Sequence, residues 1–236
     1  MTMTSENPLY QRRRPPTAAE LQAIPWLKTL STDERDRAAA DIRIAVAQTG
    51  ETVCRSGRPV TYWFGVVDGL LKMSIDNAQG QTTTLIGIPP GGWFGEGTAL
   101  KREAYRYNIH ALRKTVVAGL HVDTFHWLLD HSIGFNRFIM NQLNERLGQF
   151  IAARESDRLN NPELRVARSL AALCNPVLYP GVGNVLRITQ QELAYIAGLS
   201  RQRANAALQM LQDQGLIQVE YGGLRVLDLS GLQSQA

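Results

Sequence analysis

Two arginines and a glutamine stand together at the start of a short amphipathic segment near the C-terminus. Arg201, Gln202 and Arg203 follow Ser200, a residue type that often caps the start of a helix. Arginine can pair with the two acceptors of guanine, and glutamine with two atoms of adenine. The cluster therefore has the chemistry to recognise base edges in a DNA major groove. The competing interpretation is an ordinary helical hairpin whose arginines contact only solvent.

The sequence around this cluster predicts two short helices joined by a tight turn. Thr189 and Glu192 have the spacing of a capping box at the start of the first helix. Gly198 stands where that helix must end, because glycine enters the left-handed region at little steric cost. The residues expected to form the inward face recur at helical spacing; they are Leu193, Ile196, Leu199, Ala204, Leu208 and Leu211.

The segment after the second helix predicts a β-hairpin. Leu216–Val219 and Leu224–Leu229 flank a turn made by Tyr221, Gly222 and Gly223. A helix pair followed by such a hairpin is typical of a winged helix-turn-helix. We therefore expect residues 160–236 to bind double-stranded DNA.

The composition is that of a folded globular chain. Hydrophobic residues make up 44% of the 236 residues and charged residues 19%, which excludes a disordered chain. No run approaches the roughly 20 apolar residues of a membrane span. The arginines near the N-terminus have no apolar stretch after them, so we expect no secretory signal. Cys54 and Cys174 form neither a disulfide framework nor a metal cluster, and they favour a reducing cytoplasm.

Catalytic chemistry is not indicated. The sequence shows no nucleophile–base pair, no metal-spaced cluster and no glycine-rich nucleotide loop, so we expect no catalytic residue and no metal site. The net charge of +4 is weak support for DNA binding, because residues 160–236 carry six arginines against five acidic residues. The local placement of the arginines carries that prediction.

The first half of the chain divides into three patterns. Residues 1–16 are expected to form a mobile tail. From residue 17 to 47 the pattern is helical, with a cap at Ser31. Short apolar runs separated by turn residues then predict a compact antiparallel β-sandwich or roll; they are residues 61–67, 70–75, 82–88 and 116–122.

A long helix without proline is predicted from Phe125 to about Arg158. Its apolar residues recur at alternating spacings of three and four, the pattern of a coiled-coil seam; they are Met140, Leu143, Leu147 and Phe150. This pattern favours contact with a second copy of the chain, and the alternative is a helix packed on its own β domain. The run from Asn160 to Pro162 then predicts a hinge, followed by a helix over 163–174.

This order of elements resembles the Crp/Fnr family of bacterial transcription regulators. The resemblance covers residues 21–229 and is most specific in ITQQELAYIAGLSRQRANAALQMLQDQGLI. It implies an α+β fold: an N-terminal β-roll like that of cyclic-nucleotide-binding domains, a long dimerisation helix and a C-terminal winged helix-turn-helix. We accordingly expect an effector-sensing domain over 17–124, a dimerisation helix over 125–159 and a DNA-binding domain over 160–236.

A second motif carries the resemblance, namely Phe94-Gly95-Glu96 followed ten residues later by Arg106. In the family this is the phosphate-binding cassette of the effector pocket. Backbone amides around a glycine bind anions, an arginine pairs with phosphate oxygens, and a carboxylate accepts a ribose hydroxyl. The resemblance implies a cyclic nucleotide or another small effector. The implied effector-binding residues are Gly95, Glu96, Arg106, Tyr107, Phe150 and Ile151.

Three of these positions differ from the family pattern. Tyr107 replaces a small hydroxyl residue; its bulk fills the pocket, or its phenol serves as a substitute donor. Phe150 and Ile151 stand where the resemblance places hydroxyl side chains that face an adenine. An adenine amine placed there would lose a partner, at a cost of about 1–3 kcal/mol. We therefore expect an effector other than cyclic AMP, or a pocket that needs none.

The DNA-contacting residues also differ in part from the family pattern. Arg201 takes the position of a guanine-reading arginine, whereas Gln202 replaces an acidic residue and favours adenine over cytosine. Ala206 stands where the family has a second arginine. The half-site should therefore be related to TGTGA but differ from it. The implied DNA contacts are Thr189, Gln191, Ser200, Arg201, Gln202, Arg203 and Asn205.

Together these observations predict a homodimeric transcription regulator that binds a palindromic operator, with RNA polymerase as a further partner and no membrane contact. An effector would bias the hinge and so set the spacing of the two recognition helices. Two alternatives stay open. One is a ligand-independent regulator with a vestigial pocket, and the other is a cyclic-nucleotide-binding module that acts on a protein partner.

Overall fold

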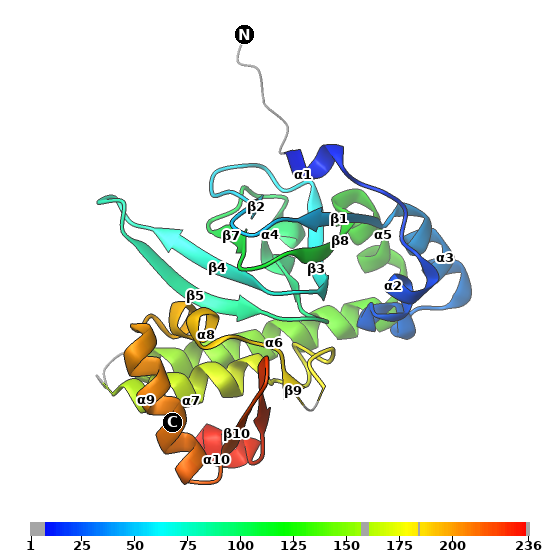
Figure 1. Cartoon of the computed structure of the whole chain (residues 1–236). Helices are drawn as coiled ribbons and strands as arrows, with labels where there is room; N and C mark the ends of the chain where they lie inside the picture. The colour runs from blue at the N-terminus through cyan, green and yellow to red at the C-terminus, as the bar shows by residue number, and fades with distance from the viewer. Residues whose placement is uncertain (1–7, 157–160, 184, 235–236) are drawn as a thin grey trace.

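The computed structural model describes residues 8–156, 161–183 and 185–234, and Figure 1 shows their arrangement. A β-roll made of β1 to β8 lies above one long helix, α6 (Ile133–Ser156). Residues 161–234, called the C-terminal module below, pack beneath the roll and beside α6. The predicted α+β architecture of roll, long helix and winged helix-turn-helix is confirmed.

The roll consists of two four-stranded antiparallel sheets, in the orders β1-β8-β3-β6 and β2-β7-β4-β5. The four predicted strands correspond to β3, β4, β5 and β8. Of the other four strands of the roll, β2, β6 and β7 have two to four residues each, too few to show an alternating pattern. The bounds are β1 Arg43–Ala47, β2 Thr52–Cys54, β3 Tyr62–Asp68, β4 Leu71–Asp76, β5 Thr82–Ile88, β6 Trp93–Phe94, β7 Asn108–Ala111 and β8 Thr115–His121.

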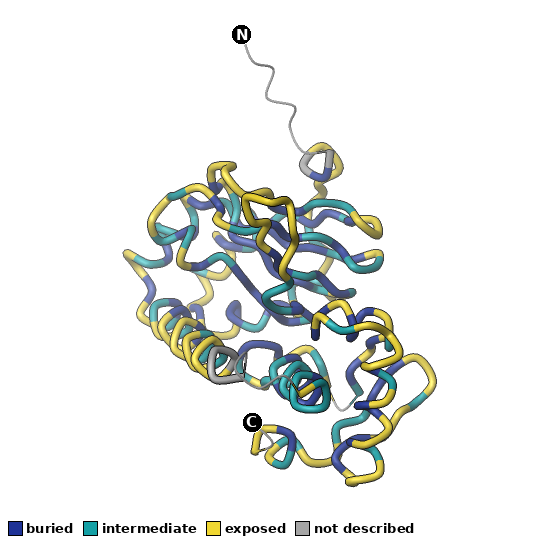
Figure 2. The backbone as a smooth tube through the Cα atoms, turned by 90° about the vertical axis from the view of Figure 1, so that its left-hand side faces the viewer, coloured by how far each residue is buried: buried dark blue, intermediate teal, exposed yellow. Residues whose placement is uncertain are grey.

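Aromatic side chains form the centre of the roll and join it to α6. The rings of Trp63 and Trp93 lie 4.3 Å apart, and Trp26 and Phe135 contact the same cluster. Gly65 makes this possible, because a Cβ at that position would lie 2.3 Å from the Trp93 ring. Figure 2 shows the strands of the roll as mostly buried. The cluster therefore fixes the first turns of α6 against the roll.

The expectation of a mobile tail over residues 1–16 is wrong for residues 8–16, and residues 1–7 lie outside the described part of the chain. Helix α1 (Pro8–Gln11) buries Leu9 in the core of the roll. Arg14 exchanges two backbone hydrogen bonds with Ile44 of β1, at 2.9 and 2.8 Å. The segment is ordered because it covers an edge strand and buries an apolar side chain.

The helical pattern predicted over residues 17–47 breaks into α2 (Ala18–Gln22), η1 (Pro25–Thr29) and α3 (Thr32–Asp41). Pro25 begins η1 and prevents a continuous helix. The cap predicted at Ser31 is present, since its hydroxyl accepts the Glu34 amide at 3.4 Å. The prediction is wrong for residues 43–47, which form β1 and pair with β8.

The long helix predicted from residue 125 is interrupted at Ser132. Helix α5 (Val122–His131) ends there, and the Ser132 hydroxyl accepts the Phe135 amide at the start of α6. Residues 125–131 pack on the roll, with Phe125 and Leu128 fully buried, so the long helix expected over 125–159 begins instead at Ile133, and its role in dimerisation stays a prediction. Residues 157–159 and Asn160 of the expected hinge lie outside the described residues, whereas Asn161 caps α7.

The C-terminal module contains the predicted helix pair and wing. A short strand, β9, adds a third member to the wing sheet, in the order β10-β11-β9, and a final helix, α10, was not predicted. In the part of the chain that the structure describes, no helix is both long and apolar enough to cross a membrane. The bounds are α7 Pro162–Leu173, β9 Val185–Leu186, α8 Gln190–Ala197, α9 Arg201–Asp213, β10 Ile217–Glu220, β11 Gly223–Val226 and α10 Leu229–Ser234.

Candidate functional site

The helix-turn-helix is built by local hydrogen bonds that the sequence predicts. The Thr189 hydroxyl accepts the Glu192 amide at 3.2 Å, and the Glu192 carboxylate accepts the Thr189 amide at 2.7 Å. Gly198 ends α8 in the left-handed region, with φ of 64°. The Ser200 hydroxyl then accepts the Arg203 amide at 3.3 Å and starts α9. These caps fix where α9 begins, and therefore which side chains lie in its first turn.

Helix α9 has one buried face and one exposed face. Ala204, Leu208 and Leu211 are at most 1% exposed and pack in the core of the module. Arg201, Gln202 and Arg203 are exposed, and no ion pair engages either arginine among the described residues. Three polar side chains on the first turn of a rigidly supported helix can therefore reach base edges without first breaking other contacts.

The other predicted DNA-contacting residues differ in how far they are exposed and in the hydrogen bonds that they already make. Gln191 is exposed, whereas the Thr189 and Ser200 hydroxyls already accept backbone amides within the helix caps. Asn205 is half-buried, and its Oδ1 is buried without a hydrogen-bond partner in the part of the chain that the structure describes. Arg201, Gln202, Arg203 and Gln191 are therefore the best-presented of the predicted residues.

Helix α6 has two faces with different surroundings. Phe135 and Ile139 are buried against the roll. The predicted seam points away from it, with Met140 60% and Leu147 59% exposed. Leu143 and Phe150 of the same seam are also exposed, and Figure 2 shows α6 with an exposed outer face as far as the grey segment that follows it. A stripe of exposed apolar side chains on a long helix marks an interaction surface.

The cassette glycine and glutamate lie at the start of α4 (Glu96–Lys101). Gly95 precedes that helix with φ of 85°, and Glu96 is 2% exposed. The Nε of Arg146, on α6, donates to Glu96 Oε1 at 2.7 Å, and its Nη2 donates to the Trp93 carbonyl at 2.8 Å. Burial opposes the charge on Arg146, but Glu96 and Tyr179 together outweigh it and raise the Arg146 pKa. Glu96 Oε2 is buried and has no hydrogen-bond partner among the described residues.

Tyr107 occupies the space beside the cassette glycine. A Cβ on Gly95 would lie 2.9 Å from the Tyr107 hydroxyl oxygen, which is buried. Burial raises the pKa of Tyr107, while the Thr98 side chain acts in the opposite direction. The phenol is therefore neutral at physiological pH and can act as a hydrogen-bond donor.

Arg106 is not brought to Gly95 or Glu96. Its side chain is 77% exposed and pairs with Glu103 at 2.9 Å. The arginine that does reach Glu96, Arg146, was missed by the sequence analysis. The available signal was its spacing from Phe135, Ile139 and Gln142, which places it on the inner face of α6.

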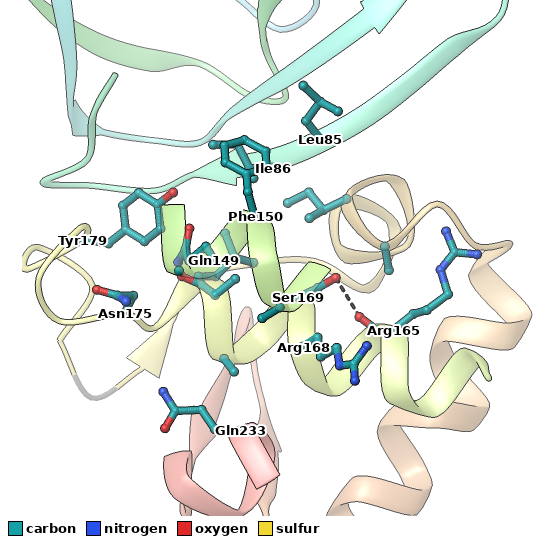
Figure 3. A pocket seen from close by; sticks show the side chains of 18 of the residues that line it. Leu85, Ile86, Gln149, Phe150, Arg165, Arg168, Ser169, Asn175, Tyr179 and Gln233 are labelled. Atoms are coloured by element: carbon teal, nitrogen blue, oxygen red, sulfur yellow. Dashed lines mark hydrogen bonds between the residues drawn. The ribbon is translucent and has the colours of Figure 1, made fainter. Parts of the chain in front are cut away.

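A cavity of about 400 Å³ lies where β5, α6, α7 and α8 meet. Phe150 points from α6 towards Leu85 and Ile86 of β5, as Figure 3 shows. Neither Gly95 nor Glu96 lines this cavity. Phe150 therefore does not share a cavity with the cassette residues. Ile151 does not line it either and is 56% exposed. Among the described residues, no three His, Cys, Asp or Glu side chains are placed to hold a metal ion.

Comparison with protein families matches both halves of the chain. A model of the cyclic nucleotide-binding domain matches residues 45–132, and a model of the Crp-like helix-turn-helix domain matches residues 164–235. These two models together cover nearly all of the roll, α5 and nearly all of the C-terminal module.

Individual relatives agree with these models over most of the chain. The transcriptional regulator LdrP of Thermus thermophilus is 27% identical over 188 residues, covering 79% of this chain and 93% of that protein. The cyclic AMP receptor protein of the same organism is 24% identical over 216 residues, covering 92% and 98%. The structure of the c-di-GMP responsive regulator CLP of Xanthomonas campestris has the same fold, with a TM-score of 0.56 and 21% identity over 83% of this chain and 99% of that one.

Proposed function

Because the chain belongs to the Crp/Fnr family of transcription regulators, which are not enzymes, we propose that it binds a two-fold symmetric DNA site as a homodimer through the exposed first turn of α9. The observation that carries this proposal is the exposed cluster of Arg201, Gln202 and Arg203 in front of a buried helix face. In this proposal the chain acts on chromosomal DNA in the cytoplasm and passes its effect to RNA polymerase.

Each exposed side chain has a distinct role in the proposed DNA contact. Arg201 donates to the two acceptors of a guanine, and Gln202 pairs with an adenine at the neighbouring step. Arg203 and Gln191 contact phosphates or flanking bases. Thr189 and Ser200 position the helices through their caps and contact the DNA backbone, and Asn205 must turn outwards to take part.

The homodimer in this proposal forms through the outer face of α6. Met140, Leu143 and Leu147 are exposed in one copy and have coiled-coil spacing, so two copies can bury them against each other, whereas Phe150 of the predicted seam points towards β5. Two-fold pairing then presents two α9 helices to half-sites one DNA turn apart, about 34–36 Å.

The effector is proposed to bind at the cassette. Glu96 Oε2 and the Tyr107 hydroxyl are buried without hydrogen-bond partners among the described residues, and a small ligand with hydroxyl groups would satisfy both. Ile151 is exposed and Phe150 is apolar, so neither supports an adenine in this copy. Relatives whose names refer to cyclic AMP and to c-di-GMP indicate that such chains respond to different ligands.

A second candidate is a regulator that needs no effector. It is favoured by Arg106, which pairs with Glu103 in solvent, and by Tyr107, which fills the space beside Gly95. Thermal unfolding with cyclic AMP, cyclic GMP and c-di-GMP separates the two candidates, because a ligand bound only by the folded state raises the midpoint. A rise with one nucleotide supports effector control, and no rise with any of them supports the second candidate.

DNA binding itself is tested by selection from a pool of random duplexes with the purified protein. We expect enrichment of a palindrome whose half-sites are one turn apart, with affinity that falls as salt rises. A chain that acts on a protein partner instead would enrich no sequence.

A further inference from the structure

Two turns of the roll reach outwards and contact the C-terminal module. They are the β3–β4 turn with Leu70 and the β7–β8 turn with Leu112 and Arg113, called the docking turns below. Leu70 is 1% exposed, yet it belongs to the hydrophobic core of the module, and Leu112 packs on the same core. These leucines are covered by the module and not by the roll that carries them.

The docking turns are held in shape from inside the roll. The hydroxyl of Thr115 accepts the Leu70 amide at 3.1 Å and donates to the Arg113 carbonyl at 2.8 Å. The Leu112 amide donates to the Leu70 carbonyl at 2.9 Å. Thr115 is completely buried, so the two turns form one preformed surface.

Arg113 joins this surface to the first helix of the helix-turn-helix. Its Nε lies 2.9 Å from Glu192 Oε1, with the two side chains 30% and 11% exposed. Its Nη2 donates to the Arg187 carbonyl at 2.6 Å. Glu192 uses its other oxygen to cap α8, where it accepts the Thr189 amide. One carboxylate therefore fixes both the start of α8 and its position against the roll.

A separate apolar contact lies further along α8. Gly87 of β5 faces Ile196 of α8 and Leu173 of α7, and a Cβ on Gly87 would lie 2.6 and 2.8 Å from these side chains. Figure 1 shows α8 directly below β5. Arg201, Gln202 and Arg203, in the first turn of α9, are exposed. The contact surface and the base-reading surface are thus separate, and both can be used at once.

We propose that Arg113 is a positioning residue: through Glu192 it holds the helix-turn-helix in one orientation on the roll, so that both recognition helices of a dimer are placed in advance for their half-sites. Without Arg113 the module keeps its own core but samples several orientations. A fixed orientation lowers the ordering cost of engaging two half-sites together. The orientation of the module does not change its affinity for a single half-site.

The distance between spin labels tests the positioning directly. Labels are placed at Asp36→Cys on α3 and Gln218→Cys on β10, both exposed, in a Cys174→Ala background; Cys54 is 2% exposed and stays unlabelled. With the labelled chain diluted in excess unlabelled protein, so that distances between two chains do not contribute, we expect one narrow distance in the parent protein and a broad distribution after Arg113→Ala. Glu192→Gln should broaden it too, because the amide preserves the cap of α8 but loses the charge. The double variant should be no broader than Arg113→Ala.

The matched control is Arg102→Ala, which removes an arginine–carboxylate pair of 2.8 Å with Asp123 inside the N-terminal half. It should leave the distance narrow. A narrow distance in Arg113→Ala, or a broad one in the parent, overturns the proposal. Far-UV circular dichroism of each variant separates loss of orientation from loss of fold.

The consequence for DNA rests on the function proposed above. In Arg113→Ala, the preference for a duplex with two half-sites over one with a single half-site should fall about tenfold or more, since linked binding typically gains 10²–10⁴-fold. Equal loss on both duplexes contradicts a positioning role. If the parent protein binds neither duplex specifically, the proposed function fails, while the label distances still decide the role of Arg113.

Discussion

Arg146 donates its Nε hydrogen to Glu96 Oε1 over 2.7 Å, and this pair joins the middle of α6 to the first turn of α4. Both side chains are nearly buried, at 12% and 3% exposed. The helix that carries the proposed dimer seam is therefore bonded directly to the cassette glutamate. A change at the cassette can reach α6 without passing through any other element.

Removal of one partner of this pair should strongly destabilise the protein. Arg146→Leu leaves Glu96 buried and unpaired, at a cost of about 3–5 kcal/mol in the free energy of unfolding, measured by urea denaturation. The matched control is Arg137→Leu on the exposed side of α6, which should change the free energy by less than about 0.5 kcal/mol. A second change, Glu96→Gln in the Arg146→Leu background, should recover part of the loss, because no buried charge then remains. A loss no larger than that of the control would show that the pair contributes little.

Tyr107 should control access to the cassette. Tyr107→Ser removes the ring beside Gly95 and restores the small hydroxyl typical of the family, so we expect cyclic AMP to raise the unfolding midpoint of this variant more than that of the parent. Tyr107→Phe keeps the ring and serves as the control, with no added response. An identical response to cyclic AMP in all three proteins would contradict this role of the ring.

The outer face of α6 should determine the oligomeric state. Leu147→Glu places a charge in the exposed apolar stripe, and we expect analytical ultracentrifugation to show a dimer for the parent and a monomer for the variant. Asn141→Glu introduces the same charge at an exposed position away from the stripe and should stay dimeric. Dimerisation of Leu147→Glu at the affinity of the parent would move the interface elsewhere.

Local signals explain why the helix-turn-helix was predictable. The caps and the turn are made by residues that bond backbone groups only a few positions away, namely Thr189, Glu192, Gly198 and Ser200. Their spacing in the sequence is therefore enough to predict where each helix begins and ends. The same holds for the cap at Ser31. Where a hydrogen bond stays within one turn, the sequence pattern and the structure agree.

Long-range contacts explain what the sequence could not show. Leu9 is buried and Arg14 ordered only because β1 lies beside them, so their segment looks like a tail in the sequence. Arg146 and Glu96 are fifty residues apart, and no periodicity in the sequence predicts that they form a pair. Arg106 has the motif spacing but turns to Glu103, because an exposed neighbour is available three residues away. The contacts of Glu96 and Arg106 therefore could not be predicted from the motif spacing alone.

The central claim, that α9 recognises a DNA sequence, is tested most directly by competition titrations with Arg201→Ala on the selected palindrome and on unrelated duplex DNA. We predict that specific affinity falls roughly 5- to 150-fold, as expected for a lost contact of about 1–3 kcal/mol with a base, while non-specific affinity changes little. Arg225→Ala on the wing removes the same charge from an arginine that pairs with Glu220 at 2.6 Å, and it should spare the specific contact. Equal losses on both duplexes for Arg201→Ala would contradict the account.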